Sequence, residues 1–159
     1  MIEIRAAGPD DLNLVADFIR KLAEYEKLSH EVRFDLDTMG RHLFGAQPAA
    51  EVIIGEVDGK PKGFALFFQT FSTFEGKPGI YLEDLFVEPE ARGSGLGRAL
   101  LSRLAALVVE RGGARLEWSV LDWNELGKRF YRSIGAASVD GWERWRMEGD
   151  SIARLADGG

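Results

Sequence analysis

The sequence contains no cysteine. This absence excludes disulfide bonds, thiolate metal sites and a cysteine nucleophile from the chemistry of the chain. Histidine is scarce as well, with two residues in 159. One of them, His30, opens the segment HEVRF, which lacks the second histidine of the zinc motif HExxH, so we expect no metal site.

Long apolar runs are also missing. No window approaches the ~20 apolar residues that a membrane-spanning helix needs, and the first residues, MIEIRAAGPDDL, lack the basic region and apolar stretch of a signal peptide. We therefore expect a cytoplasmic protein that does not cross a membrane. The formal net charge of −6 and the sequence pI of about 5.0 argue against nucleic acid or an anionic membrane as a partner. The same charge is compatible with a cationic substrate.

The apolar pattern predicts an α/β fold, and the length favours one domain rather than two. Helical spacing predicts helices at about 9–28, 35–45, from the glycines at 93–97 to Gly112, and at 124–134. Strands are predicted at 2–5, 51–57, 62–70, 80–87 and 115–121, with a last strand or pair within 137–147. The dipeptide Asp58-Gly59 predicts a hairpin between two of them. We expect a mixed sheet flanked by helices within residues 1–150, followed by a C-terminal tail, 151–159, that frays.

A run of glycines, ARGSGLGR at 91–98, follows the strand-like segment YLEDLFV. Its spacing misplaces the third glycine of the dinucleotide motif GxGxxG, and Arg98-Ala99 stands where a Walker A loop needs lysine followed by serine or threonine. A glycine turn at the start of a helix directs several backbone N–H groups at one point, which is typical of a phosphate or pyrophosphate site. The alternative is a tight turn between a strand and a helix that binds no ligand.

Three segments together carry a resemblance to a known family. RGSGLG after YLEDLFVEPEA resembles the acyl-CoA signature of the GNAT superfamily of N-acetyltransferases. With EYEKL at 24–28 and VLDWNELGKRFYRSIGA at 120–136, the chain is similar to the diamine (spermidine/spermine) acetyltransferases, and most similar to their thialysine N-acetyltransferase branch. The resemblance covers about residues 2–147. It implies a GNAT fold with a mostly antiparallel sheet, a homodimer, and transfer of acetyl from acetyl-CoA to a primary amine of a small cationic substrate by direct attack.

The resemblance also implies which residues hold the acetyl donor. The pyrophosphate of CoA is expected on the backbone amides of the loop formed by Arg92, Gly93, Ser94, Gly95, Leu96, Gly97 and Arg98. The pantetheine arm is expected to pair like an added strand with the backbone of Leu85, Phe86 and Val87. Asn124 matches a CoA contact and is equally typical of a helix cap. Gly127 replaces a CoA-contacting serine of the family; as a mid-helix glycine it is expected to cost about 1 kcal/mol relative to alanine.

Acetyl transfer to an amine requires a base and an acid. An alkylammonium has a pKa near ~10.4, so at pH 7 a base must remove its proton, and the resemblance implies that Glu83 does so through water. It implies that Tyr131 protonates the departing thiolate. Strand alternation predicts that Asp84 points to the face opposite Glu83, where it serves a dimer or substrate edge or is only a solvated acid. The implied acceptor contacts are Tyr25, Glu26, Glu83, Glu117, Trp118 and Ser119.

The acceptor is the least defined part of the prediction. Polyamine-preferring members of the family carry an acid and a tryptophan in the loop before YLED, where this chain has Ser72, Thr73 and Phe74. The loss of one carboxylate favours a shorter amine or an amino acid such as thialysine over a polyamine. The alternatives are an acetyltransferase for a protein lysine or an amine drug, and a non-catalytic CoA-binding module that would need neither Glu83 nor Tyr131. Trp142 and Trp145 are expected in packing or in a dimer contact.

Overall fold

The computed structural model describes residues 1–159, which form two compact units, Met1–Leu121 and Asp122–Gly159. The first unit contains one sheet of five strands in the order β1-β2-β3-β4-β5. The first four strands are antiparallel neighbours, and β5 runs parallel to β4, so the predicted mixed, mostly antiparallel sheet is confirmed. The strands are β1 Ile2–Ala6, β2 Glu51–Val57, β3 Lys60–Ser72, β4 Lys77–Val87 and β5 Arg115–Trp118.

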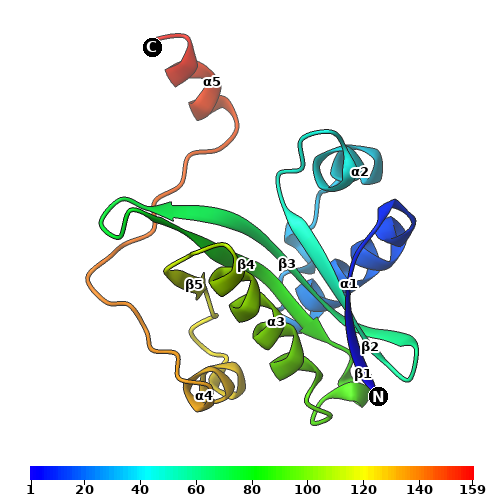
Figure 1. Cartoon of the computed structure of the whole chain (residues 1–159). Coiled ribbons are helices and arrows are strands. Elements are labelled where there is room, and N and C mark those ends of the chain that lie inside the picture. The colour runs from blue at the N-terminus through cyan, green and yellow to red at the C-terminus, as the bar shows by residue number, and fades with distance from the viewer. The chain divides into compact units, whose positions relative to one another are not determined.

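Three α-helices and three short 3-10 helices complete the first unit. They are η1 Pro9–Asp11, α1 Leu12–Tyr25, η2 Ser29–Glu31, α2 Leu36–Phe44, η3 Pro89–Ala91 and α3 Leu96–Glu110. Helices α1 and α2 lie on one face of the sheet and α3 lies on the other (Figure 1). No helix of the chain is both long enough and apolar enough to cross a membrane.

The alternation of side chains along the strands produces a core on each face of the sheet. On the α1 face, Phe18 stacks on Phe64 with ring centroids 5.4 Å apart and lies 5.9 Å from Phe86. On the α3 face, the small residues Gly55 and Gly63 admit Leu96, which would lie within 3.3 Å of a Cβ at either position. Both faces of the central strands are therefore buried, and the two layers of helices are packed against one rigid platform.

Two irregularities interrupt the ladder around β4. The register between β3 and β4 shifts by one residue: Phe67 pairs with Leu82, but Leu66 pairs with Asp84. Glu83 is therefore the extra residue of a β-bulge. On its other side, β4 pairs with β5 only as far as Leu82, opposite Trp118. Beyond this point β4 continues to Val87 without a strand neighbour on that side.

The second unit contains two helices, α4 Glu125–Ser133 and α5 Asp150–Ala156. The strand or strand pair predicted within 137–147 is wrong, because this segment has no partner strand in its unit and a lone strand leaves its N–H and C=O groups unpaired. The tail that was predicted to fray contains the short helix α5, which has Asp150 in its first turn and Arg154 in its last, the favourable arrangement for the helix dipole.

Several element boundaries also differ from the predictions. The strand predicted at 115–121 ends at Trp118, while the strands predicted at 62–70 and 80–87 extend to Lys60–Ser72 and Lys77–Val87. The predicted hairpin turn between β2 and β3 is confirmed, with positive φ at both Asp58 and Gly59. Helix α1 ends at Tyr25 rather than near 28 because Lys27 adopts the left-handed conformation, with φ of 61°.

Candidate active site

The bulge in β4 positions a group of carboxylates beside the end of α1. Glu83 is the bulged residue and is exposed, whereas the adjacent Asp84 is half-buried. Glu26 follows the last residue of α1 and is also half-buried. The strict alternation that predicted opposite faces for Glu83 and Asp84 does not hold through the bulge, and Asp84 is not simply a solvated acid.

The proximity of these carboxylates changes their acidity. Burial raises the pKa of Asp84 to about 7, and the charges of Glu83 and Glu26 add to the rise. Burial, followed by the charge of Glu83, also raises the pKa of Glu26. Every cause of these two shifts acts in the same direction, because burial and a neighbouring carboxylate each disfavour the ionised form. The site therefore has an excess of negative charge that a bound cation would stabilise.

Arg92 connects the end of α1 to the loop after β4. Its guanidinium lies 5.1 Å from the centre of the Tyr25 ring and 5.9 Å from that of Phe86. Its Nε donates a hydrogen bond of 3.1 Å to the carbonyl oxygen of Val87. These contacts bring the predicted acceptor residue Tyr25 against the first residue of the predicted phosphate loop.

The glycine loop opens α3 as predicted. Gly93 and Gly95 have φ of 82° and 93°, a region that favours glycine. The Ser94 hydroxyl donates to the Ala91 carbonyl at 2.6 Å and accepts from the Leu96 amide at 3.3 Å, which holds the turn in shape. The first turn of α3 contains no acidic residue. Its amides and the positive end of its dipole thus favour an anion such as a phosphate.

The predicted pantetheine strand lies at the open edge of β4. Phe86 is buried in the core, and the side chains of Leu85 and Val87 are half-buried. Only the backbone of these residues is therefore available to a ligand that adds to the edge. Leu96 is likewise a core residue, with 1% of its surface exposed, so its amide rather than its side chain belongs to the loop.

The end of β5 carries the remaining predicted acceptor residues. Glu117 is exposed and pairs with Tyr81 in the parallel ladder, and Trp118 is half-buried at the last pair. Ser119 follows the strand, and its hydroxyl forms a hydrogen bond of 2.6 Å with the Tyr81 hydroxyl. The ring of Tyr81 lies 5.3 Å from that of Phe68.

Three predicted residues belong to the second unit. Asn124 caps α4, because its Oδ1 accepts a hydrogen bond of 3.0 Å from the Gly127 amide. Gly127 lies in the first turn of α4, so its expected mid-helix position is wrong. A Cβ at Gly127 would lie 2.6 Å from Asn124 Nδ2, so the glycine makes room for the cap. Tyr131 lies half-buried about one turn beyond Gly127 in α4, with its ring 5.5 Å from that of Phe130.

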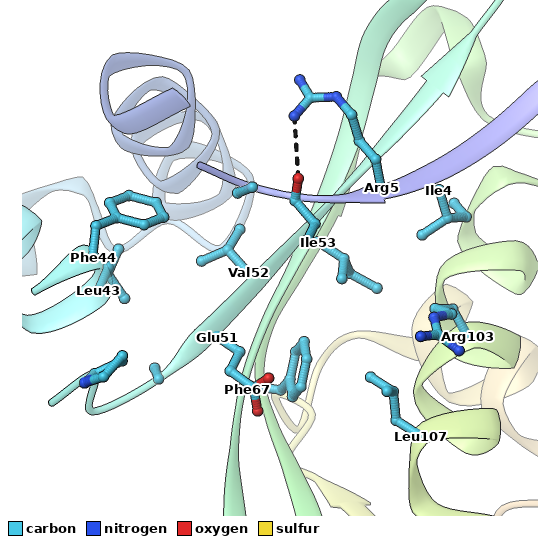
Figure 2. A pocket seen from close by; sticks show the side chains of 14 residues that line it. Ile4, Arg5, Leu43, Phe44, Glu51, Val52, Ile53, Phe67, Arg103 and Leu107 are labelled. Carbon is cyan, nitrogen blue, oxygen red and sulfur yellow. Dashed lines mark hydrogen bonds between the residues drawn. The ribbon is translucent and has the colours of Figure 1, made fainter. Parts of the chain in front are cut away.

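A cavity of about 330 Å³ opens elsewhere in the first unit, between β1, β2, α2 and α3. Figure 2 shows its apolar walls, which include Leu43, Ile53 and Leu107. Its charged residues are engaged with protein groups: Arg5 with Asp11 and Glu56, Glu51 with Arg111, and Arg103 with Glu110. The cavity contains none of the predicted site residues, and it presents no convergent polar groups to a ligand.

The structure thus brings most of the predicted residues of the first unit to one region, around the end of α1, the bulge of β4 and the glycine loop. Sequence reasoning missed two residues there. Asp84 was predicted to serve a dimer or substrate edge or to be only a solvated acid, and its burial beside Glu83 was missed, although two adjacent acids near the end of a strand were a visible signal. Tyr81 was missed because its bond to Ser119 depends on the parallel register of β4 and β5, which no local pattern reveals.

Comparisons with known proteins show the family of the chain. The acetyltransferase (GNAT) family model matches residues 17–136. A thialysine N-epsilon-acetyltransferase from Bos taurus is 34% identical, over 98% of this chain and 97% of the relative. An L-ornithine N5-acetyltransferase from Arabidopsis thaliana is 27% identical, over 96% of this chain and 86% of the relative.

A solved structure extends the similarity to the fold. The integron cassette protein VCH_CASS6, from the mobile metagenome of V. cholerae, superposes with a TM-score of 0.79 at 29% identity, covering 98% of this chain and 97% of that chain. The matched span of the family model includes the bulged strand, the glycine loop and α4. The chain therefore belongs to the acetyltransferase (GNAT) family, as the glycine loop and the YLED and VLDWN segments predicted.

Proposed function

We propose that this protein is a cytoplasmic enzyme that transfers acetyl from acetyl-CoA to the primary amine of a small cationic substrate. Residues 1–150 would act as one catalytic domain. The observation that carries the proposal is the cluster of Glu26, Glu83 and Asp84 beside a glycine loop suited to phosphate, in a chain of the GNAT family. A cationic acceptor supplies the positive charge that this cluster lacks.

Glu83 is the proposed base. It is exposed at the bulge, so water can connect it to the ammonium group of the acceptor. Once the proton has passed to Glu83, the neutral nitrogen attacks the thioester carbon directly, an N–C bond forms and the C–S bond breaks. Tyr131 is the proposed acid that gives a proton to the sulfur, and its phenolate then takes up the second proton of the acetylated nitrogen. This assignment rests on its place in the family motif. A tyrosine suits this role because its ordinary pKa of about 10 keeps it protonated at neutral pH.

The acetyl donor is assigned to the open edge of β4 and the glycine loop. Residues 83–87 of β4 have no strand neighbour on the β5 side, which leaves room for the pantetheine arm to pair with Leu85, Phe86 and Val87. The loop from Arg92 to Arg98 supplies backbone amides and the start of α3 for the pyrophosphate. Asn124, on the cap of α4, is proposed as a further contact.

Thialysine or a similar amino acid is the acceptor that we favour. The relatives from Bos taurus and Arabidopsis thaliana are named for thialysine and L-ornithine, which supports an amino acid with a terminal amine. Tyr25, Glu26, Glu117, Trp118 and Ser119 are its proposed contacts. At the β3–β4 hairpin, the Ser72 hydroxyl accepts a hydrogen bond from the backbone amide of Glu75, and Phe74 is exposed. Ser72, Thr73 and Phe74 thus provide no carboxylate at the positions where polyamine-preferring members carry one.

Gly93→Ala tests the phosphate loop. It should raise the Kd for CoA at least about tenfold, because a left-handed residue with a side chain redirects the loop amides. Gly112→Ala is a matched control: Gly112 also has positive φ, and no atom lies within 4 Å of a Cβ at either position. Isothermal titration with CoA measures the Kd of both variants. Equal affinities in the two variants would contradict the assignment.

Glu83→Gln tests the base. With acetyl-CoA and thialysine at pH 7, kcat should fall by roughly 10²–10⁴, the usual contribution of a positioned base. The deficit should shrink towards pH 10, where the amine loses its proton without help. Thiol release measures the rate, and Glu3→Gln, an exposed glutamate of β1, is the control. A variant as active as the unmodified protein at pH 7 would exclude Glu83 as the base.

We also propose a homodimer. Trp142 and Trp145 in the second unit have 82% and 87% of their surfaces exposed, which leaves both side chains available for contact with a second chain. Sedimentation equilibrium should give twice the 17.6 kDa mass of the chain, and Trp145→Asp should lower the mass towards that of one chain. A single-chain mass for the unmodified protein would contradict the proposal.

A further inference from the structure

We propose that Tyr81 is a positioning residue for acetyl transfer: its hydrogen bond to Ser119 sets the opening between β4 and β5 in which the acetyl donor and the base meet. The inference rests on the proposed function, because the opening matters only if the pantetheine arm enters it. Because the Ser119 hydroxyl is bonded to Tyr81, the contact with the acceptor proposed above for Ser119 is assigned to its backbone.

The bond lies at the point where the two parallel strands separate. The last pairs of the ladder are Tyr81 with Glu117 and Leu82 with Trp118. Tyr81 lies one residue before the end of pairing on β4, and Ser119 lies one residue after its end on β5. Their hydroxyl oxygens are 2.6 Å apart, and either hydroxyl can donate. The side-chain bond therefore closes the ladder just where its backbone bonds stop.

A third strand fixes the direction of the tyrosine. Phe68 of β3 is the register partner of Tyr81, and the two rings lie 5.3 Å apart at an angle of 31°. Because this contact restricts the ring, the hydroxyl has a defined place at the end of β5. Phe68, Tyr81 and Ser119 thus form a chain of contacts across β3, β4 and the end of β5.

The position of this bond relative to the base gives it a function. Glu83 follows Tyr81 by two residues and is the bulged residue, held by no register partner on β3. The edge of β4 from Glu83 to Val87 is the edge assigned to the pantetheine arm. If Ser119 were released, the end of β5 could move away from β4. The thioester and the Glu83 carboxylate would then no longer be held at a fixed position relative to each other. A misplacement of about 1 Å can reduce a rate by as much as 10²-fold.

The geometry argues against a role in folding alone. The Tyr81–Ser119 bond is exposed to solvent, and hydroxyls at the surface exchange one hydrogen bond for another with water at little net gain. Removing one oxygen should therefore change the melting temperature little, while its effect on the rate should be measurable. This difference separates a positioning role from a structural one.

The test is a double-mutant cycle with Tyr81→Phe, Ser119→Ala and the double variant. Each single change should lower kcat with thialysine about tenfold and weaken CoA binding several-fold, and the double variant should be no worse than either, because all three lack the same bond. Ser119→Thr keeps the hydroxyl and should retain activity. Ser102→Ala, an exposed serine of α3, should leave kcat and the Kd for CoA unchanged.

The outcomes separate this inference from the proposed function. If thialysine gives no turnover with the unmodified protein, the proposed acceptor fails, and the cycle in CoA affinity still decides the role of Tyr81. Folded Tyr81→Phe protein with unchanged kcat and unchanged CoA affinity would overturn the inference. Losses that multiply in the double variant would overturn it as well, because they would show that the two hydroxyls act separately.

Discussion

The candidate site depends on the interruption of hydrogen-bond pairing along β4. On the β3 side, the bulge leaves Glu83 without a register partner; on the β5 side, pairing ends at Leu82. A fully paired strand would direct successive side chains to alternate faces and would have no free edge. The two interruptions coincide within one residue, so an acid side chain and an open backbone edge occur at the same place. The proposed base and the proposed donor edge both follow from this coincidence.

The negative charge of the site lies at the same interruption of β4, where Glu83 and Asp84 follow each other. Burial and the charge of Glu83 disfavour the ionised forms of Asp84 and Glu26, so the pKa values of both side chains are raised. Since the pKa of Asp84 is about 7, part of the negative charge is removed by protonation at neutral pH. The acceptor that we propose is a cation, and its binding would stabilise the ionised form.

Regular local patterns predicted most of the fold. The β-rich runs on either side of the Asp58-Gly59 turn identified the β2–β3 hairpin, and the glycine loop and leucine spacing identified α3. The bulge at Glu83 was not predictable, because a one-residue shift depends on the partner strand rather than on the strand itself. The segment 137–147 alternates enough to suggest a strand, but its unit supplies no neighbour for it.

The site residues likewise divide into those that the sequence predicted and those that only the folded chain reveals. Glu83, Tyr131 and the glycine loop were found through motifs that are continuous in the sequence. Asp84 was judged by strand alternation, which the bulge breaks, and its acidity depends on burial that a sequence does not state. The Tyr81–Ser119 bond joins residues 38 positions apart through a parallel register. Contacts of this kind require the folded chain.

The most direct test of the account is thiol release from acetyl-CoA with a panel of amines: thialysine, lysine, putrescine, spermidine, spermine and a lysine peptide. We predict acetylation of a small cationic primary amine, with kcat/KM for thialysine above that for the polyamines, since Ser72, Thr73 and Phe74 stand where polyamine-preferring members of the family carry an acid and a tryptophan. Absence of thiol release with every amine, in protein that binds CoA, would contradict it and leave a CoA-binding module.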